Sequence, residues 1–301
     1  MTAIDEIRRR IVGTTTGLFA HAPYPLEDSL RYEGDPGLFG PDTVTWRVIG
    51  DVATFVGGIR ALLVQAAHQE VAAGVADHSR YQDDPLGRLS RTSAYVTATA
   101  FGAMPEVENA VRMVRRAHRP VRGESHRLKG YSADDPGQAA WVHNVLTYSF
   151  LAAYQVFGRD SLDEREADRF VAEQTAVGRL LDANPLPRTA DVLTDWVVGH
   201  PDLGLSPGME TAVDFLRSPP LPWTVRVPYR ILYWAAVATI PQTLRGLLGL
   251  RRIPGAIVMG KVLIKFLRWA LGSSPSWYLA LTRVGAPLPN GHRFRTHPFE
   301  P

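Results

Sequence analysis

Apolar residues recur every three or four positions along most of this chain, a spacing that places them on one face of an α-helix. Turns rich in proline, glycine and aspartate separate the periodic segments, and the sequence shows neither a run of alternating strands nor an internal repeat. We therefore expect an all-α, single-domain helical bundle. The pattern predicts helices over residues 44–76, 88–102, 105–118, 137–157, 162–182, 189–199, 207–217, 229–248 and 254–271.

One predicted helix is apolar almost all round. Residues 139–157 carry large apolar side chains on nearly every side, with one histidine, His143, among them. A helix without a polar face is normally enclosed by other helices. We expect this segment to lie at the centre of the bundle.

A histidine interrupts the apolar stripe of the helix predicted over residues 105–118. Val107, Val111, Val114 and His118 follow the spacing of one face, whereas the arginines of this segment fall mainly elsewhere. An ionisable side chain that points inward is costly unless a partner satisfies it. That partner is a hydrogen-bonding group, a metal or a haem iron.

The preceding helix carries a polar stripe. Arg88, Thr92, Tyr95 and Thr99 share one of its faces. Arg88 either pairs with a carboxylate such as Asp84 or anchors an anionic group of a ligand, such as a propionate. The sequence alone leaves both interpretations open.

Two further histidines, His68 and His143, also lie on apolar stripes. Each of the three, taken alone, is more often a hydrogen-bonded core residue than a ligand. Helix bundles nevertheless build metal and cofactor sites from the side chains of facing helices. A non-haem metal bound by His68, His118 and His143 together is therefore one alternative.

Composition removes several kinds of site. The chain has no cysteine, so its residues form no disulfide, zinc–thiolate site, iron–sulfur cluster or thiolate-ligated haem. It also lacks the glycine-rich phosphate loops of nucleotide-binding proteins, the Gly-x-Ser-x-Gly elbow of serine hydrolases and the His-Glu-x-x-His motif of zinc peptidases. The first residues lack the cationic-then-apolar order of a secretory signal, so we expect a cytoplasmic protein.

The charges are divided unevenly along the chain. Residues 215–301 hold 12 Lys and Arg and one acidic residue, a net charge of +11, whereas residues 1–214 hold 21 basic and 29 acidic residues, a net charge of −8. The basic part is suited to an anionic surface or to docking on the acidic part. The basic residues are interleaved with apolar runs and no nucleic-acid-binding motif occurs, so we do not expect nucleic acid as a partner.

The helix predicted after Pro254 places Lys261, Lys265 and Arg268 on one face and apolar residues on another. This basic amphipathic pattern is typical of a helix that lies in a membrane surface. It is equally typical of an ordinary surface helix that extends its lysines into solvent. We expect peripheral contact with the inner face of a membrane as one outcome and internal docking as the other.

Several motifs together resemble a known family over roughly residues 35–250. It is the family of haem-dependent oxygenases that includes the latex clearing protein, a rubber oxygenase, and the mycophenolic-acid-pathway oxygenase mpaB, and the resemblance is to an actinobacterial branch. The motifs are His68, Gly74-Val-Ala-Asp-His-Ser79, Asp84-Pro, Arg88-Leu-x-x-Thr92-x-x-Tyr95, Phe101-Gly102, His118-x-x-Val-x-Gly123, Tyr131-x-Ala133-x-Asp135-Pro and Trp141-Val-His143.

The resemblance implies an all-α, globin-like core that binds haem b. In it, His118 matches the residue that binds the iron. Arg88 and Thr92 match the arginine and threonine beside the haem. Arg91 stands where the rubber oxygenase has a lysine that caps the iron, and because arginine stays protonated it is a poor ligand.

The resemblance also implies an organisation and a function. Residues 1–34 are expected to form an N-terminal extension, residues 35–250 the catalytic domain, and residues 251–301 the basic amphipathic helix and a proline-rich tail. The expected function is that of a haem b-dependent oxygenase that uses dioxygen on a small hydrophobic, isoprenoid- or lipid-like substrate. His68 and His143 are candidates for a role on the distal side of the iron. The alternatives are a helical protein with structural histidines, with or without haem, and the non-haem metal enzyme.

Overall fold

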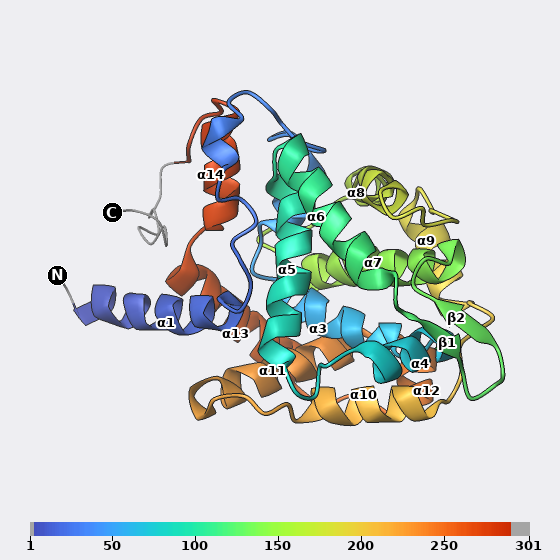
Figure 1. The fold of residues 1–301 in the computed structure, drawn as a ribbon. Helices are drawn as coiled ribbons and strands as arrows, with labels where there is room; N and C mark the ends of the chain where they lie inside the picture. Colours follow the sequence, from blue (N-terminus) through green and yellow to red (C-terminus); the bar gives the residue numbers. More distant parts are fainter. Residues whose placement is uncertain (1–2, 290–301) are drawn as a thin grey trace.

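The computed structural model describes residues 3–289 and shows a helical molecule with one small two-stranded sheet (Figure 1). The all-α fold class is confirmed. In chain order the elements are α1 (Ala3–Phe19), η1 (Ser29–Arg31), α2 (Val44–Ile49), α3 (Thr54–Gln65), α4 (Gln69–His78), α5 (Pro85–Phe101), α6 (Met104–His118), β1 (Arg122–Glu124), β2 (Gly130–Ser132), α7 (Pro136–Phe157), α8 (Glu164–Arg179), α9 (Ala190–Val198), α10 (Pro207–Arg217), α11 (Trp223–Thr239), α12 (Gln242–Leu247), α13 (Ala256–Leu271) and α14 (Pro275–Arg283).

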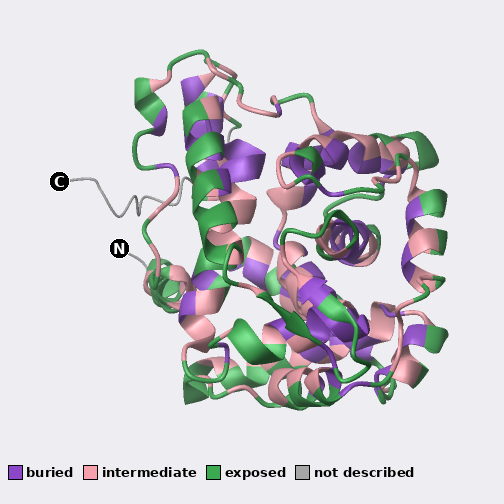
Figure 2. Cartoon of the chain, turned by 45° about the vertical axis from the view of Figure 1, so that its right-hand side comes forward, coloured by how far each residue is buried: buried purple, intermediate pink, exposed green. Residues whose placement is uncertain are grey.

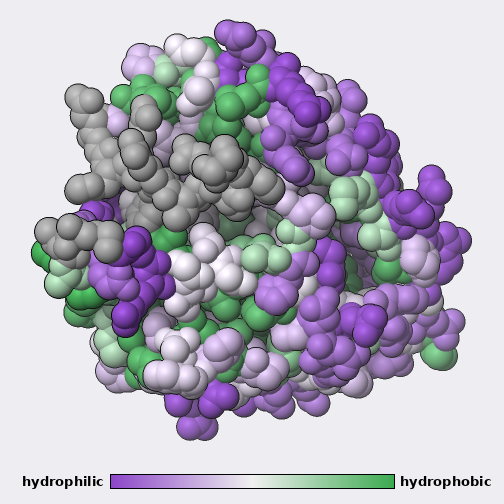
Figure 3. All heavy atoms as spheres, turned by 60° about the vertical axis from the view of Figure 1, so that its left-hand side comes forward, coloured by the Kyte–Doolittle hydropathy of each residue, from purple (hydrophilic) through white to green (hydrophobic). Residues whose placement is uncertain are grey.

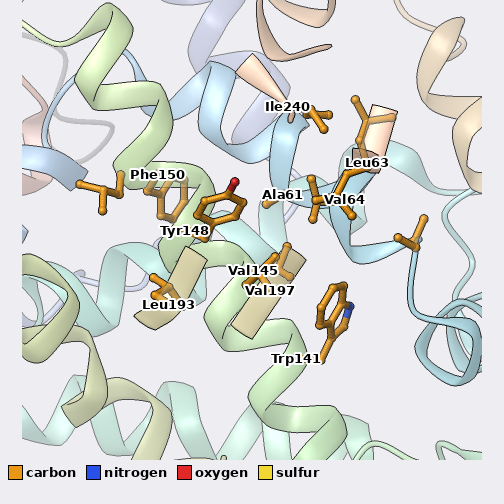
Figure 4. Close-up of a cluster of buried hydrophobic side chains, with 14 of the residues drawn as sticks. Ala61, Leu63, Val64, Trp141, Val145, Tyr148, Phe150, Leu193, Val197 and Ile240 are labelled. Carbon is orange, nitrogen blue, oxygen red and sulfur yellow. The ribbon is translucent and has the colours of Figure 1, made fainter. Parts of the chain in front are cut away.

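Helix α7 lies at the centre, as its apolar sequence predicts. Asp135 begins it by accepting a hydrogen bond from the Gln138 amide, and α3, α8, α9, α11 and α13 pack around it. Trp141 is fully buried and donates through Nε1 to the Gln65 carbonyl. Figure 4 shows Trp141, Val145 and Tyr148 of α7 among side chains from α3 and α9, and Figure 2 shows buried residues gathered on the inner sides of the helices.

The prediction of one continuous helix over residues 44–76 is wrong, because two turns divide this segment into three helices. At the first break the Asp51 carboxylate accepts the Ala53 amide at 2.8 Å, a side-chain contact that favours a turn. At the second break His68 is the residue that caps α4, and its Nδ1 accepts the Val71 amide at 3.4 Å. His68 therefore lies at a helix start and not on a helix face.

Several other helices differ from the predicted ones in their bounds or were not predicted. The segment predicted as one helix over residues 229–248 begins earlier, at Trp223, and breaks at Pro241, which lacks the amide hydrogen needed to continue a helix. Helix α1 lies in the segment expected to be an extension. Helix α14 lies in the segment expected to be a proline-rich tail, and Ser274 caps it by accepting the Trp277 amide.

The sheet, which the sequence does not predict, is a hairpin that rests on α4. Strands β1 and β2 are antiparallel, with Gly123 opposite Tyr131. The Tyr131 hydroxyl donates to Asp77, and its ring packs against Gly74, where a Cβ atom would lie 3.2 Å from it. The hairpin thereby holds the chain between α6 and α7 against the core.

On helix α13 the three basic residues do not form the exposed stripe that the sequence predicts. Lys261 and Lys265 are exposed, but Arg268 points inward, where it donates to the Asp51 carboxylate at 2.7 Å and to the Phe157 carbonyl at 2.8 Å. Arg268 therefore connects the C-terminal part of the chain to the rest of the molecule. Within residues 3–289 no helix combines the length and apolar character that crossing a membrane requires.

Candidate functional site

Helices α5 and α6 bring Arg88 and His118 to the same end of a helical hairpin. The two helices pack against each other and are joined by two residues, Gly102 and Ala103. Arg88 lies 13 positions before the end of α5, and His118 lies 14 positions after the start of α6. At about 1.5 Å per residue both are roughly 20 Å from the turn. The sequence motif thus places a histidine and an arginine at the same, open end of the hairpin.

His118 is half-buried at the C-terminal end of α6. Val107 and Val111 of its stripe are buried, as predicted. Burial lowers the pKa of the His118 imidazole, and the nearby Asp134 carboxylate only partly opposes this shift. The ring is therefore neutral at neutral pH and keeps one nitrogen lone pair. A cavity of about 230 Å³ adjoins it, lined by Arg115, His118, Arg119, Ala133, Asp134, Leu181 and Asp182.

Arg88 is a cation without a carboxylate partner among residues 3–289. Its Nη1 donates to the Ser79 hydroxyl at 2.7 Å, and its guanidinium lies 5.5 Å from the centre of the Tyr81 ring. Burial lowers its pKa. The interpretation that Arg88 pairs with Asp84 is wrong, because the Asp84 carboxylate accepts hydrogen bonds from Arg91 and from the Gly87 amide.

The other residues of α5 divide between surface and interior. Arg91 and Thr92 are exposed, so the polar stripe of this helix does not continue inward at position 92. Tyr95 is half-buried, and its hydroxyl has no hydrogen-bond partner in the described part of the chain. Burial raises the pKa of Tyr95, although Arg115 nearby acts in the opposite direction. The Tyr95 hydroxyl is thus an available donor between α5 and α6.

His143 faces α8 and not the end of the α5–α6 hairpin. Its ring packs on Gly178, where a Cβ atom would lie 2.9 Å from the ring carbon Cδ2. Burial lowers its pKa to about 4, and a hydrogen bond with the Gln174 backbone acts in the opposite direction. The structure therefore places this histidine in a helix–helix contact.

His68 belongs to a separate cluster with His200 and Asp202. The potential ligand atoms of these three residues lie within 4.8 Å of one another, and no other group of this kind occurs among residues 3–289. The group contains neither His118 nor His143, so a metal site made of the three predicted histidines is wrong. His68 is 2% exposed, and its ring lies 5.4 Å from Trp141 and 5.0 Å from His200, measured between ring centres.

Charged residues from the β hairpin enclose this cluster. Arg127 donates to both Glu70 and Asp202, and Lys129 donates to Asp202 at 2.7 Å. Burial alone would raise the pKa of Asp202, but these hydrogen bonds from Lys129 and Arg127 lower it to about 2. Burial lowers the pKa of His68 to about 4. The cluster therefore holds neutral imidazoles beside ionised carboxylates at neutral pH.

Sequence reasoning missed His200 and Asp202. Both follow α9 in a turn, 132 and 134 residues after His68, and neither lies on a periodic stripe. The bridge between His68 and Leu203 brings this turn to the start of α4. The single local signal is the compact His200-Pro201-Asp202 group, which is not a known metal motif by itself.

Comparison with known proteins gives one result. Residues 46–269 match the family described as "ER-bound oxygenase mpaB/B'/Rubber oxygenase, catalytic domain". The chain belongs to this family. The family named from the sequence motifs is thus confirmed, and the match includes both the α5–α6 hairpin and the His68 cluster. No curated protein and no solved structure matches the chain.

The residues at the end of the α5–α6 hairpin fit a haem in their chemistry. His118 offers a neutral imidazole, the usual proximal ligand, and Arg88 offers a cation with no carboxylate of its own. The cavity beside His118 is smaller than the roughly 300 Å³ at which pockets for organic ligands begin. The cavity as it stands is therefore too small for a ligand of that size.

Proposed function

We propose that the protein is a haem b-dependent oxygenase that uses dioxygen on a small apolar substrate of isoprenoid or lipid type. The family supports oxygenase chemistry, and the name rubber oxygenase supports a hydrocarbon-like substrate. The observation that carries the cofactor assignment is Arg88. A half-buried guanidinium without a carboxylate partner is costly, and an acidic group of a bound cofactor would compensate it.

In this proposal each residue has a defined role. His118 would hold the iron, because its lowered pKa keeps the ring neutral and one nitrogen lone pair available. A haem held there would supply an iron that can bind and activate dioxygen. Arg88 holds a propionate, and Tyr95 offers a hydroxyl hydrogen bond. Arg91 is exposed and paired with Asp84, so it stays away from the iron.

Haem titration tests the ligand. The purified protein should bind one haem per chain with a Soret shift, and His118→Ala should abolish stoichiometric binding while its helical circular-dichroism spectrum persists. His21→Ala, which changes an exposed histidine, is the matched control and should bind as the wild type does. Full haem binding with an unchanged Soret position in His118→Ala would remove His118 from the role of ligand.

A second pair of variants tests the anchoring role of Arg88. Arg88→Leu removes a half-buried cation that has no carboxylate partner among residues 3–289, so the haem-free protein should be as stable as the wild type or more stable. Haem affinity should nevertheless fall by about tenfold or more, since a charge-assisted bond worth roughly 1.5–3 kcal/mol is lost. Arg112→Leu, at an exposed position of α6, should change neither quantity. Equal haem affinity of the two variants would refute anchoring by Arg88.

The cluster of His68, His200 and Asp202 supports a second candidate, a non-haem iron oxygenase. Two imidazoles and one carboxylate form the ligand set of such enzymes. Two observations favour the haem site instead. Both Nδ1 atoms accept backbone hydrogen bonds, which places the imidazole protons on Nε2, and Arg127 and Lys129 already occupy one oxygen of Asp202.

Metal analysis combined with a pyridine haemochrome assay separates the two candidates. The haem proposal expects iron and haem in equal amounts, lost together in His118→Ala and retained in His200→Ala. The non-haem candidate expects iron without haem, lost in His200→Ala and retained in His118→Ala.

A further inference from the structure

Helix α13 exposes large apolar side chains on its outer face. Val258 and Val262 are 65% and 66% exposed, and Phe266 and Trp269 are 45% and 44% exposed. The opposite face, with Ile264 and Leu267, is buried against α11 and α7. An ordinary surface helix has one apolar face, which it buries. This helix has a second apolar face that the described part of the chain does not cover.

The exposed apolar surface continues onto α1. Arg8 donates to the Trp269 carbonyl at 2.6 Å and lies 5.1 Å from the centre of the Trp269 ring, so α1 and the end of α13 are in contact. Ile4, one turn before Arg8, is 56% exposed, and Ile7, next to Arg8 in the sequence, is 50% exposed. Two exposed isoleucines therefore lie on the helix that contacts the exposed tryptophan.

Helix α11 extends the same surface. Its start carries Trp223 and Val227, which are 80% and 66% exposed. A Cβ atom on Gly260 of α13 would lie 2.7 Å from Ala235, and Figure 1 shows α11 and α13 side by side with the start of α11 on the side of α1. Figure 3 turns this side forward and shows hydrophobic and near-neutral side chains among hydrophilic ones. We call this surface the α1/α11/α13 face.

The charges that α11 and α13 contribute to this face are all positive, whereas α1 carries Asp5 and Glu6 beside three arginines. Residues 215–289 contain no aspartate or glutamate, so α11 and α13 carry no acidic residue. Lys261 and Lys265 are exposed between the apolar residues of α13 and form no ion pair within residues 3–289. Arg268 and Arg283, by contrast, pair with Asp51 and Glu106. Ion pairs inside the molecule thus neutralise the two arginines. The two lysines remain as exposed charges without an ion pair within residues 3–289.

We propose that the α1/α11/α13 face binds the surface of an anionic lipid bilayer. Tryptophan and phenylalanine are suited to the interface between headgroups and acyl chains, and lysines beside them are attracted to anionic headgroups. A second copy of the chain is a poorer occupant, because a symmetric dimer through this face would bring Lys261 and Lys265 against the same lysines. An apolar substrate dissolved in the membrane would then lie close to the protein.

Vesicle co-sedimentation tests the proposal with the full chain. The wild type should bind vesicles of phosphatidylcholine with about 30% phosphatidylserine, should bind pure phosphatidylcholine far less, and should be released by salt. Lys261→Glu with Lys265→Glu should lower the partition coefficient by roughly tenfold or more. Arg112→Glu with Arg116→Glu is the matched control, with the same spacing and exposure on α6, and should bind as the wild type does.

An apolar variant distinguishes insertion from simple charge attraction. Phe266→Ser with Trp269→Ser should weaken binding to the anionic vesicles while keeping the wild-type circular-dichroism spectrum. No binding by the wild type, or equal loss in the α6 control, would overturn the proposal. So would a dimer in sedimentation velocity that Phe266→Ser with Trp269→Ser dissociates. None of these readouts needs haem or substrate, so failure here is distinct from failure of the proposed oxygenase function.

Discussion

Arg60 and Arg88 both lack a carboxylate partner among residues 3–289 and both contact a tyrosine ring, and comparing them clarifies the role of Arg88. Arg60 is 1% exposed, donates to the Ser149 hydroxyl at 2.9 Å and lies 4.1 Å from the centre of the Tyr148 ring. Arg60 is enclosed between α3 and α7, so its aromatic and hydroxyl contacts must suffice. Arg88 differs because it lies at the same end of the hairpin as the neutral His118.

The buried histidines determine how the protein responds to acid. The pKa of His143 falls to about 4 on burial, so the unfolded chain, with a value near 6.5, binds the proton more strongly. Stability is therefore full above pH 6.5 and decreases as the pH falls towards 4. At about pH 5 this one residue should cost about 2 kcal/mol of unfolding free energy.

Urea unfolding of a His143→Gln variant at about pH 7.5 and pH 5 measures this cost. The wild type should lose more stability between the two values than the variant does, by about 2 kcal/mol. His21→Gln, at an exposed position, should leave the difference unchanged. A pH dependence that is the same in His143→Gln and the wild type would show that His143 is not buried as a neutral ring.

At the scale of elements, α3 and α7 form the closest contact in the core. Gly57 is buried in it, and a Cβ atom there would lie 2.6 Å from the Phe150 ring and 3.2 Å from the Phe150 Cα atom. The neighbouring Gly58 has open space around its Cβ position. The two adjacent glycines of one helix therefore have opposite roles.

Alanine substitution at these glycines should give opposite signs. Gly57→Ala should destabilise the fold by about 2 kcal/mol, because the main chain of α7 cannot move aside without loss of packing. Gly58→Ala should stabilise it by up to about 1 kcal/mol through helix propensity. Guanidinium unfolding of both variants measures the difference. Destabilisation of similar size by both would show that backbone flexibility matters here, and not the contact between α3 and α7.

The sequence predicts most helices and fails where side chains break them. Periodicity finds α5, α6, α7 and α10 to within three residues at their ends, because each has a continuous apolar face. Periodicity wrongly predicts α2, α3 and α4 as one helix. The hydrogen bonds of Asp51 and His68 at the two breaks leave the spacing of the apolar residues unchanged. Ser206 and Ser274 each precede a proline and cap the start of α10 and of α14, so the same residue pair in the sequence could have indicated α14.

The candidate site is predictable only in part. His118 and Arg88 lie in neighbouring helices. Their spacing along the sequence is therefore enough to predict that they lie at the same end of the helical hairpin. The group of His68, His200 and Asp202 depends on a contact across more than a hundred residues, which spacing does not encode. The contact of His143 with α8 could not be predicted for the same reason. Periodicity shows which residues share a helix face, but packing decides which neighbouring helix that face meets.

At the scale of the whole molecule, the basic C-terminal part is attached through buried arginines. Arg283 has a fully buried side chain, lies 3.7 Å from the Glu106 carboxylate and donates to the Asp35 carbonyl at 2.7 Å. Arg268 reaches Asp51 from α13. Both arginines are part of the fold, and the charge asymmetry of the chain is partly neutralised inside it. Lys261 and Lys265 remain as surface charge, which is why they and not the arginines are suited to a partner.

Substitution should separate these two uses of positive charge. Arg268→Gln should lower the unfolding free energy by about 3 kcal/mol, because it leaves the Asp51 carboxylate, whose side chain is 6% exposed, without its cation. Lys265→Gln should change it by no more than about 0.5 kcal/mol, since that side chain is solvated. Urea unfolding measures both. Adding Asp51→Asn to Arg268→Gln should recover part of the loss, because the amide needs no counter-charge, whereas purely additive effects would mean that Arg268 acts through packing and not through its pairing with Asp51.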